Sequence, residues 1–272
     1  LNIKSPSKYL GEVMEDLPDN VYLNKTTCGS GATHLCLTNQ INYVVIVPYV
    51  SAITNKTSQI SGVLAVKSGV DDVDITKHIE ESTGVCKIMT TYDSFYKVYN
   101  SIKSLDKLGD FKLCIDESHV LVSLAKIKGN CFNFLYKHFR EFKAFVFVTA
   151  TPNNKNLLPT AIRDVEFVRV NWEVSERVHI VEQRVKTLAE CNKHVIEICK
   201  QHLFGEVEGN AYIFYNSVSE IISVIQKLKK MEDFNPENVN IFCAENPYND
   251  KKISLQLGRM YTKGSFSDNK KI

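Results

Sequence analysis

The sequence predicts an α/β fold in which helices cover both faces of a parallel β-sheet. Short apolar runs rich in β-branched residues recur along the chain, helical stretches separate them, and several runs end in polar residues. Strands that alternate with helices in this way form parallel sheets, and such strands are apolar on both sides because both faces are buried. With 272 residues, 44% of them hydrophobic, the chain can form one large core or two smaller ones.

The clearest strand is predicted at 43–48, where a β-branched run, Tyr-Val-Val-Ile-Val, ends at a proline. Similar runs predict the other strands of the first half of the chain, at 62–66, 85–89, 111–115, 143–148 and 163–170. Helices are predicted at 33–38 and 92–101. Ligands of such sheets bind beyond the carboxyl ends of the strands, so the polar residues that follow these runs are the candidate site residues.

A second unit is predicted after a boundary near 171–177, which gives domains at 1–172 and 173–272. Its strands are predicted at 178–185, 211–215 and 239–244, and its helices at 190–202 and 219–231. Because so few strands fall in this part of the chain, the second domain is predicted to be partial.

The composition limits the class of protein. A net charge of +2 excludes a histone-like polybasic binder but allows a local groove lined by Lys and Arg. No apolar run approaches the roughly 20 residues of a membrane helix, and the N-terminus does not resemble a secretory signal. The eight cysteines lie mostly in apolar segments, which is typical of reduced, buried thiols. We therefore expect no membrane partner and a cytoplasmic location, in the host cytoplasm if the protein is viral.

Cys191, His194, Cys199 and His202 resemble a zinc-ligand pattern. The segment that contains them is, however, predicted to be one helix. Positions 191 and 202 would then lie about 16 Å apart along the helix axis, too far for four ligands of one zinc ion. An ordinary helix is the favoured interpretation.

A glycine-rich loop, Lys-Thr-Thr-Cys-Gly-Ser-Gly-Ala-Thr, occupies 25–33. Gly29 and Gly31 would let backbone N–H groups turn inward around a phosphate, and the positive end of the following helix would support them. The Thr33 hydroxyl occupies the place of a magnesium ligand, whereas Ala32 stands where a phosphate-binding lysine is usual. A turn that merely caps a helix remains an alternative.

An acidic pair, Asp116 and Glu117, follows the run at 111–115. Carboxylates at the end of a buried strand are costly unless they bind something, and in a nucleotide site Asp116 would hold magnesium while Glu117 polarises water. His119 can couple the acids to their neighbours by hydrogen bonding. The hydroxyls of Thr149 and Thr151 follow the next strand and could contact the acids. A helix N-terminus that favours acidic residues would also explain the pair.

In this order, Gly29-Ser-Gly-Ala-Thr33, Asp116-Glu-Ser-His119 and Thr149-Ala-Thr-Pro152 resemble the motifs of superfamily 2 helicases of the DEAD/DEAH type. The resemblance implies two RecA-like domains, with ATP and Mg²⁺ between them and nucleic acid across their top. It implies catalytic roles for Glu117, Asp116 and His119, coupling by Thr149 and Thr151, and magnesium binding by Thr33 and Asp116. The implied nucleotide contacts are Thr27, Cys28, Gly29, Ser30, Gly31, Ala32, Thr33 and His34.

Three further segments resemble the nucleic-acid-binding motifs of these helicases. They contain Pro48, Tyr49 and Ser51, then Thr90 and Thr91, and finally Asn216 and Ser217, which open the second domain. The implied partner is single-stranded or partly duplex nucleic acid, with DNA favoured. The Gly-x-Gly-Ala-Thr form also resembles replication helicases of Bacteroides-type phages, which implies replication proteins as partners.

Two departures from the family pattern affect the expected activity. Ala32 replaces the lysine, which predicts nucleotide binding weaker by roughly 10- to 150-fold, with Lys25 only a partial substitute. The last two motifs of the second domain are not recognisable, because Arg259 lacks the neighbours of an arginine finger. An ATP-dependent helicase or translocase, here truncated and poorly active alone, is the leading hypothesis. A non-catalytic nucleic-acid-binding module and a protein-docking scaffold are the alternatives.

Overall fold

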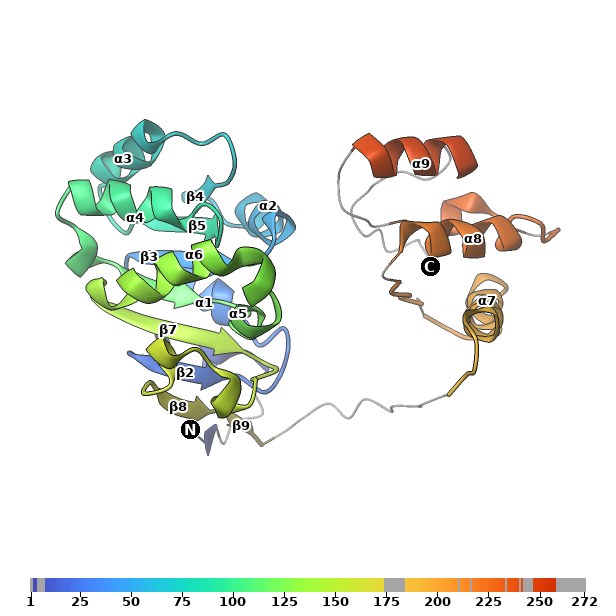
Figure 1. The fold of residues 1–272 in the computed structure, drawn as a ribbon, viewed down its shortest axis with the longest axis horizontal. Helices are drawn as coiled ribbons and strands as arrows, with labels where there is room; N and C mark the ends of the chain where they lie inside the picture. The colour runs from blue at the N-terminus through green and yellow to red at the C-terminus, as the bar shows by residue number, and fades with distance from the viewer. Residues whose placement is uncertain are drawn as a thin grey trace. The chain divides into compact units, whose positions relative to one another are not determined.

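The computed structural model describes residues 2–3, 8–173, 184–209, 211–215, 217–232, 234–239, 241 and 247–257. The backbone divides into two units, Leu1–Arg177 and Val178–Ile272, whose elements are shown in Figure 1.

The first unit is built on a seven-stranded sheet in which every pairing is parallel, in the order β4-β5-β3-β6-β7-β2-β8. The strands are β2 (Val21–Asn24), β3 (Tyr43–Val47), β4 (Val63–Val66), β5 (Lys87–Thr91), β6 (Lys112–Ile115), β7 (Ala144–Thr149) and β8 (Glu166–Arg169). A separate two-stranded ladder pairs β1 (Asn2–Ile3) with β9 (Asn171–Trp172). The predicted parallel sheet is confirmed, and it gains β2, for which the sequence analysis gave no range.

Helices cover both faces of the sheet, because successive side chains of a strand point to opposite sides. On one face, Val44, Ile46 and Phe147 share a core with α3 (Asp72–Glu81), α4 (Phe95–Ser104) and α6 (Ala125–His138). On the other face, Val45 and Val148 share a core with α1 (Ala32–Thr38) and α2 (Val50–Gln59). The remaining elements of this unit are short: α5 (Val120–Ser123), η1 (Leu10–Glu12), η2 (Leu108–Asp110), η3 (Phe139–Glu141), η4 (Lys155–Leu157) and η5 (Thr160–Ile162).

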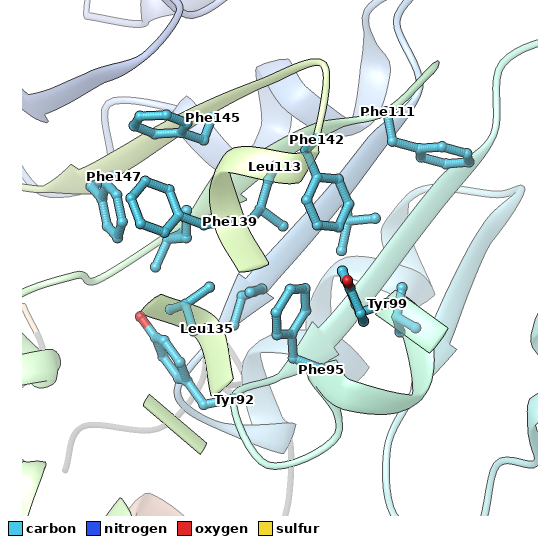
Figure 2. Packing of buried hydrophobic residues seen from close by; sticks show 14 of the residues in the cluster. Tyr92, Phe95, Tyr99, Phe111, Leu113, Leu135, Phe139, Phe142, Phe145 and Phe147 are labelled. Carbon is cyan, nitrogen blue, oxygen red and sulfur yellow. The ribbon is translucent and has the colours of Figure 1, made fainter. Parts of the chain in front are cut away.

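Aromatic rings fill much of the first of these two cores (Figure 2). The ring of Phe139 packs edge-on against Phe145 at 4.6 Å and against Phe147 at 5.3 Å between centroids. Aromatic pairs in this geometry contribute about 0.5–1.5 kcal/mol beyond the area they bury. The sheet is therefore a rigid base for the loops at its edge.

The order of the strands decides which loops meet. In a parallel sheet all carboxyl ends lie at one edge, and β6, β7 and β2 are neighbours in this one. The loops that follow these three strands carry the acidic pair, the Thr149 segment and the glycine-rich loop. The segments after β3 and β5 lie along the adjacent part of the same edge.

The regular secondary structure in the described part of the second unit consists of helices. Its elements are α7 (Leu188–Leu203), α8 (Val218–Leu228), η6 (Pro236–Asn238) and α9 (Pro247–Leu257). Residues such as Cys199, Ile222, Leu228 and Ile253 form its core. The predicted helices at 190–202 and 219–231 are present as α7 and α8.

The strand predicted at 211–215 is not formed. Its side chains still alternate, because Ile213 and Tyr215 pack on the helical core while Tyr212 and Phe214 are exposed. A strand needs a neighbour that pairs with its backbone groups, and the described residues of this unit supply none. The strands predicted at 178–185 and 239–244 lie largely outside the described residues, as does Arg259. A second RecA-like domain stays a prediction.

The helix expected at 188–202 is confirmed as α7, and the described residues contain no group of three or more side chains that could hold a metal ion. Every described cysteine is a free thiol. No helix in the described part of the chain is long and apolar enough to cross a membrane.

We expect Phe147→Ala to lower the free energy of unfolding by about 3–5 kcal/mol, because it leaves a cavity beneath Phe139. The measurement is urea unfolding followed by circular dichroism. Leu157→Ala, which changes a side chain that is 63% exposed, is the control and should shift the same free energy by less than about 0.5 kcal/mol. Equal losses in the two variants would contradict this account of the core.

Candidate functional site

The glycine-rich loop begins where β2 ends. The Lys25 N–H donates to the Thr149 carbonyl at 2.8 Å, which extends the parallel pairing by one residue. Thr26 then adopts a φ of 55°, an uncommon conformation for a residue with a side chain. It is held there by its N–H, which donates to Asn24 Oδ1 at 2.9 Å, and by its hydroxyl, which donates to the Val170 carbonyl at 2.9 Å. These bonds turn the chain out of the sheet.

Two glycines shape the rest of the loop. Gly29 and Gly31 have φ values of 73° and 80°, which favour glycine, and Gly31 is the N-cap of α1. Thr27, Cys28 and Gly29 are exposed, as is His34 on α1, whereas Ser30 and Ala32 are buried. A left-handed glycine loop that leads into a helix N-terminus can bind an anion through backbone N–H groups.

The carboxylate of Asp116 joins the loop to the end of β6. Thr33 Oγ1 donates to Asp116 Oδ2 at 2.5 Å, and the Glu117 N–H donates to Oδ1 at 2.9 Å. Asp116 is only 7% exposed. The predicted proximity of the loop and the acidic pair is therefore confirmed.

Lys25 reaches the same carboxylate from β2. Its Nζ lies 3.4 Å from Asp116 Oδ1 and 3.6 Å from Glu117 Oε1, and the residue is 5% exposed. Burial opposes protonation of Lys25, but the two carboxylates together outweigh burial and raise the pKa of its ammonium above the usual value. The side chain is thus a buried cation at the centre of the site. From the sequence, Lys25 was expected to be only a partial substitute, because no strand was predicted before it and no local pattern links it to Asp116.

His119 connects the acidic pair to β7. Its Nδ1 lies 3.2 Å from Glu117 Oε2 and 3.1 Å from Thr149 Oγ1. The Thr151 N–H also donates to Thr149 Oγ1, at 3.1 Å. Asn153, which the sequence analysis did not single out, holds His119 by donating to its carbonyl at 2.8 Å. Thr149 therefore reaches Glu117 through His119, whereas the sequence analysis expected the threonine hydroxyls to contact the acids themselves.

The residues predicted to bind nucleic acid differ in accessibility. Tyr49 and Ser51 are exposed at the start of α2, directly after the buried Pro48. Thr90 and Thr91 lie inside β5, and Thr90 is fully buried. The strand was predicted to end at residue 89, but β5 continues to Thr91 and so places Thr90 inside the sheet. A phosphate contact by the buried Thr90 hydroxyl does not fit this position.

The remaining predicted contacts fall in the second unit. Ser217 is the N-cap residue of α8, and Asn216 lies outside the described residues.

The oxygen ligands at the loop fit a magnesium ion. Thr33 and Asp116 offer a hydroxyl and a carboxylate oxygen 2.5 Å apart. Mg²⁺ prefers such hard oxygens, and it is commonly held by one or two carboxylates together with substrate phosphates rather than by a full protein cage.

Comparison with known proteins shows a likeness of fold. No protein-family model matches the chain, and no curated protein is similar to it in sequence. The Mycobacterium smegmatis helicase Lhr, solved bound to ssDNA and AMP-PNP, is similar with a TM-score of 0.51 at 11% identity, over 89% of this chain and 36% of that one.

Two further helicase structures are similar at lower scores. A DEAD box protein from Methanococcus jannaschii has a TM-score of 0.41 at 12% identity, over 88% of this chain and 59% of that one. The Pyrococcus furiosus Hef helicase domain has a TM-score of 0.40 at 15% identity, over 77% and 50%. The chain thus spans less than two thirds of each of these proteins. Its sheet and flanking helices form a RecA-like α/β fold, similar to that of the helicase Lhr.

We expect Gly31→Ala to destabilise the protein by about 1–2 kcal/mol, because alanine is strained at a positive φ. Gly129→Ala, beside the kink of α6, is the matched control: Gly129 has no positive φ and open space around it, so the variant should change stability by less than about 0.5 kcal/mol. Thermal unfolding of the two variants measures the difference. A Gly31→Ala variant as stable as the parent would show that the loop does not need this conformation.

Proposed function

We propose that the chain is part of the motor core of an ATP-dependent nucleic-acid helicase or translocase of the DExH type. The observation that carries the proposal is the Asp116 carboxylate, which hydrogen-bonds to Thr33 of the glycine-rich loop beside the buried cation Lys25. This arrangement lies at the carboxyl edge of a RecA-like sheet, where ligands of such sheets bind.

Each residue of the proposed site has a chemical task. The loop N–H groups between Thr27 and Thr33 orient the phosphates of ATP, and Thr33 with Asp116 would hold Mg²⁺, which neutralises phosphate charge when bound. Glu117 polarises the attacking water and accepts its proton, as a carboxylate with a partly exposed side chain can do. His119 fixes Glu117 and transmits its state to Thr149, through the contacts of 3.2 and 3.1 Å.

Nucleic acid would cross the adjacent part of the same edge. Tyr49 and Ser51 at the start of α2, together with the backbone after β5, would contact phosphates without reading bases. Asn216 and Ser217 stay predicted contacts of the second unit. Such binding is largely independent of sequence and weakens with salt, because phosphate contacts release counterions. DNA as the favoured nucleic acid, a phage origin and replication partners stay predictions.

A non-catalytic nucleic-acid-binding module is the second candidate. The observation that favours it is Ala32, a small buried side chain where these helicases carry a lysine. The two candidates differ in turnover, so a single kinetic comparison separates them.

We expect Glu117→Gln to lower single-strand-stimulated ATP hydrolysis by about 10²–10⁴-fold, because it removes the base but keeps the shape. ATP affinity should not fall, because the neutral amide does not repel the phosphates. Phosphate release at saturating ATP and single-stranded DNA measures the rate, and calorimetry measures the affinity. Glu81→Gln, on the exposed surface of α3, is the matched control and should leave both unchanged. Turnover that survives Glu117→Gln would contradict the role of Glu117. A parent that binds both ligands but stays without turnover when it is joined to a complete second domain would favour the non-catalytic module.

We expect Ser51→Glu to weaken binding of single-stranded DNA by about fivefold at low salt, because a like charge near 4 Å from a phosphate costs about 1 kcal/mol in water. The loss should be similar for unrelated DNA sequences. Fluorescence anisotropy with labelled oligonucleotides measures it. Ser58→Glu, exposed near the other end of α2, adds the same charge away from the edge and is the control. An equal loss in both variants would place the nucleic acid elsewhere.

A further inference from the structure

Lys25 occupies the position in space from which a cation can bind the phosphates of a nucleotide. We propose that Lys25, at the end of β2, binds the terminal phosphates of ATP and so replaces the lysine that is missing at Ala32. The inference rests on the proposed function, since it names the residue that binds phosphate within the same site. It revises the sequence-based expectation that Lys25 is a minor substitute.

Lys25 and Thr33 share one carboxylate. Thr33 Oγ1 binds Oδ2 of Asp116 at 2.5 Å, while Lys25 Nζ lies 3.4 Å from Oδ1 of the same group. The two residues are eight positions apart in the sequence, but the loop folds back so that its first and last side chains meet at Asp116. A lysine at position 32 would belong to the same loop. The ammonium is therefore supplied by a different position of the loop but lies at the same site.

Hydrogen bonds hold the backbone of Lys25 in place. Its N–H is paired with Thr149, and its carbonyl accepts the Thr27 N–H at 2.6 Å and the Trp172 indole N–H at 2.9 Å. The following residue, Thr26, is locked at a positive φ. The four-carbon stem of lysine can then move its ammonium from a carboxylate to a phosphate without any change in the backbone.

Lys25 also offsets the negative charge of the site. Without Lys25, the groups that face the loop include the carboxylates of Asp116 and Glu117, which repel the phosphates of ATP. Lys25 lies within 3.6 Å of both carboxylates. A buried ammonium costs free energy unless it is paired, and these two carboxylates pair it.

A purely structural ion pair is the competing explanation, and the number of phosphates in the ligand separates the two. If the ion pair of Lys25 with Asp116 only holds the loop in its fold, the loss of Lys25 affects ATP, ADP and AMP alike. If Lys25 binds the terminal phosphates, its loss affects ATP and ADP but not AMP, which lacks them.

The test is isothermal titration calorimetry of the full chain with Mg-ATP, Mg-ADP and AMP. Lys25→Ala should weaken ATP and ADP binding by about 10- to 150-fold and leave AMP binding unchanged. Adding Ala32→Lys to that variant should restore most of the ATP affinity, because the ammonium returns from the other end of the loop. Lys112→Met is the matched control: Lys112 is also buried and paired with two carboxylates, Asp16 and Asp19, but at the amino end of β6. It should leave all three affinities unchanged.

The outcomes distinguish this inference from the proposed function. A parent that binds ATP as tightly as Lys25→Ala, or a variant that loses all three ligands equally, overturns the role of Lys25 and leaves the proposed function standing. A parent that binds none of the nucleotides overturns the proposed function itself.

A second measurement does not depend on the folding of a variant. An acyl phosphate derivative of ATP transfers its acyl group to a lysine amine beside the terminal phosphate, and mass spectrometry locates the modified residue. Lys25 of the parent protein should be acylated, and excess ATP should protect it. Acylation of other lysines with Lys25 unmodified would overturn the inference.

Discussion

The carboxylate of Asp116 joins the segment at 25–33 to the end of β6, two parts of the chain that are distant in the sequence. It accepts a hydrogen bond from Thr33 at the start of α1, a second from the backbone of Glu117, and the charge of Lys25 from β2. A buried carboxylate is costly without such partners, so the loop, β2 and β6 must keep their relative positions for the fold to be stable. The same requirement places the groups that a nucleotide site needs within a few ångströms of each other.

The strand order extends this arrangement to a second set of contacts. Because β7 lies between β6 and β2, Thr149 emerges between the acidic pair and the loop. His119 then lies within hydrogen-bonding distance of both Glu117 and Thr149. A change of charge or position at Glu117 therefore has a direct path to the segment that follows β7. These contacts are the physical basis for the coupling role proposed for Thr149 and Thr151.

A phosphate-binding loop needs a backbone that presents its N–H groups and an ammonium that reaches the phosphates. A sequence motif expects both at fixed positions. The N–H groups point inward only when the loop backbone has this conformation. Glycines are therefore required at positions 29 and 31, where φ is positive. An ammonium needs only to reach a point in space, and a lysine from either end of the loop can reach it. Ala32 beside an intact loop is therefore weaker evidence against nucleotide binding than the sequence suggests.

The sequence by itself determined the parallel sheet, the positions of most strands in the first unit, the glycine-rich loop and helix α7, because apolar periodicity and turn-forming residues act over a few neighbours. It also located the acidic pair at a strand end. Only the tertiary structure decided that Thr90 is buried, that residues 211–215 form no strand, and that Lys25 lies beside Asp116. Each of these depends on which segments become neighbours, and strand order and pairing join residues that local sequence patterns do not connect.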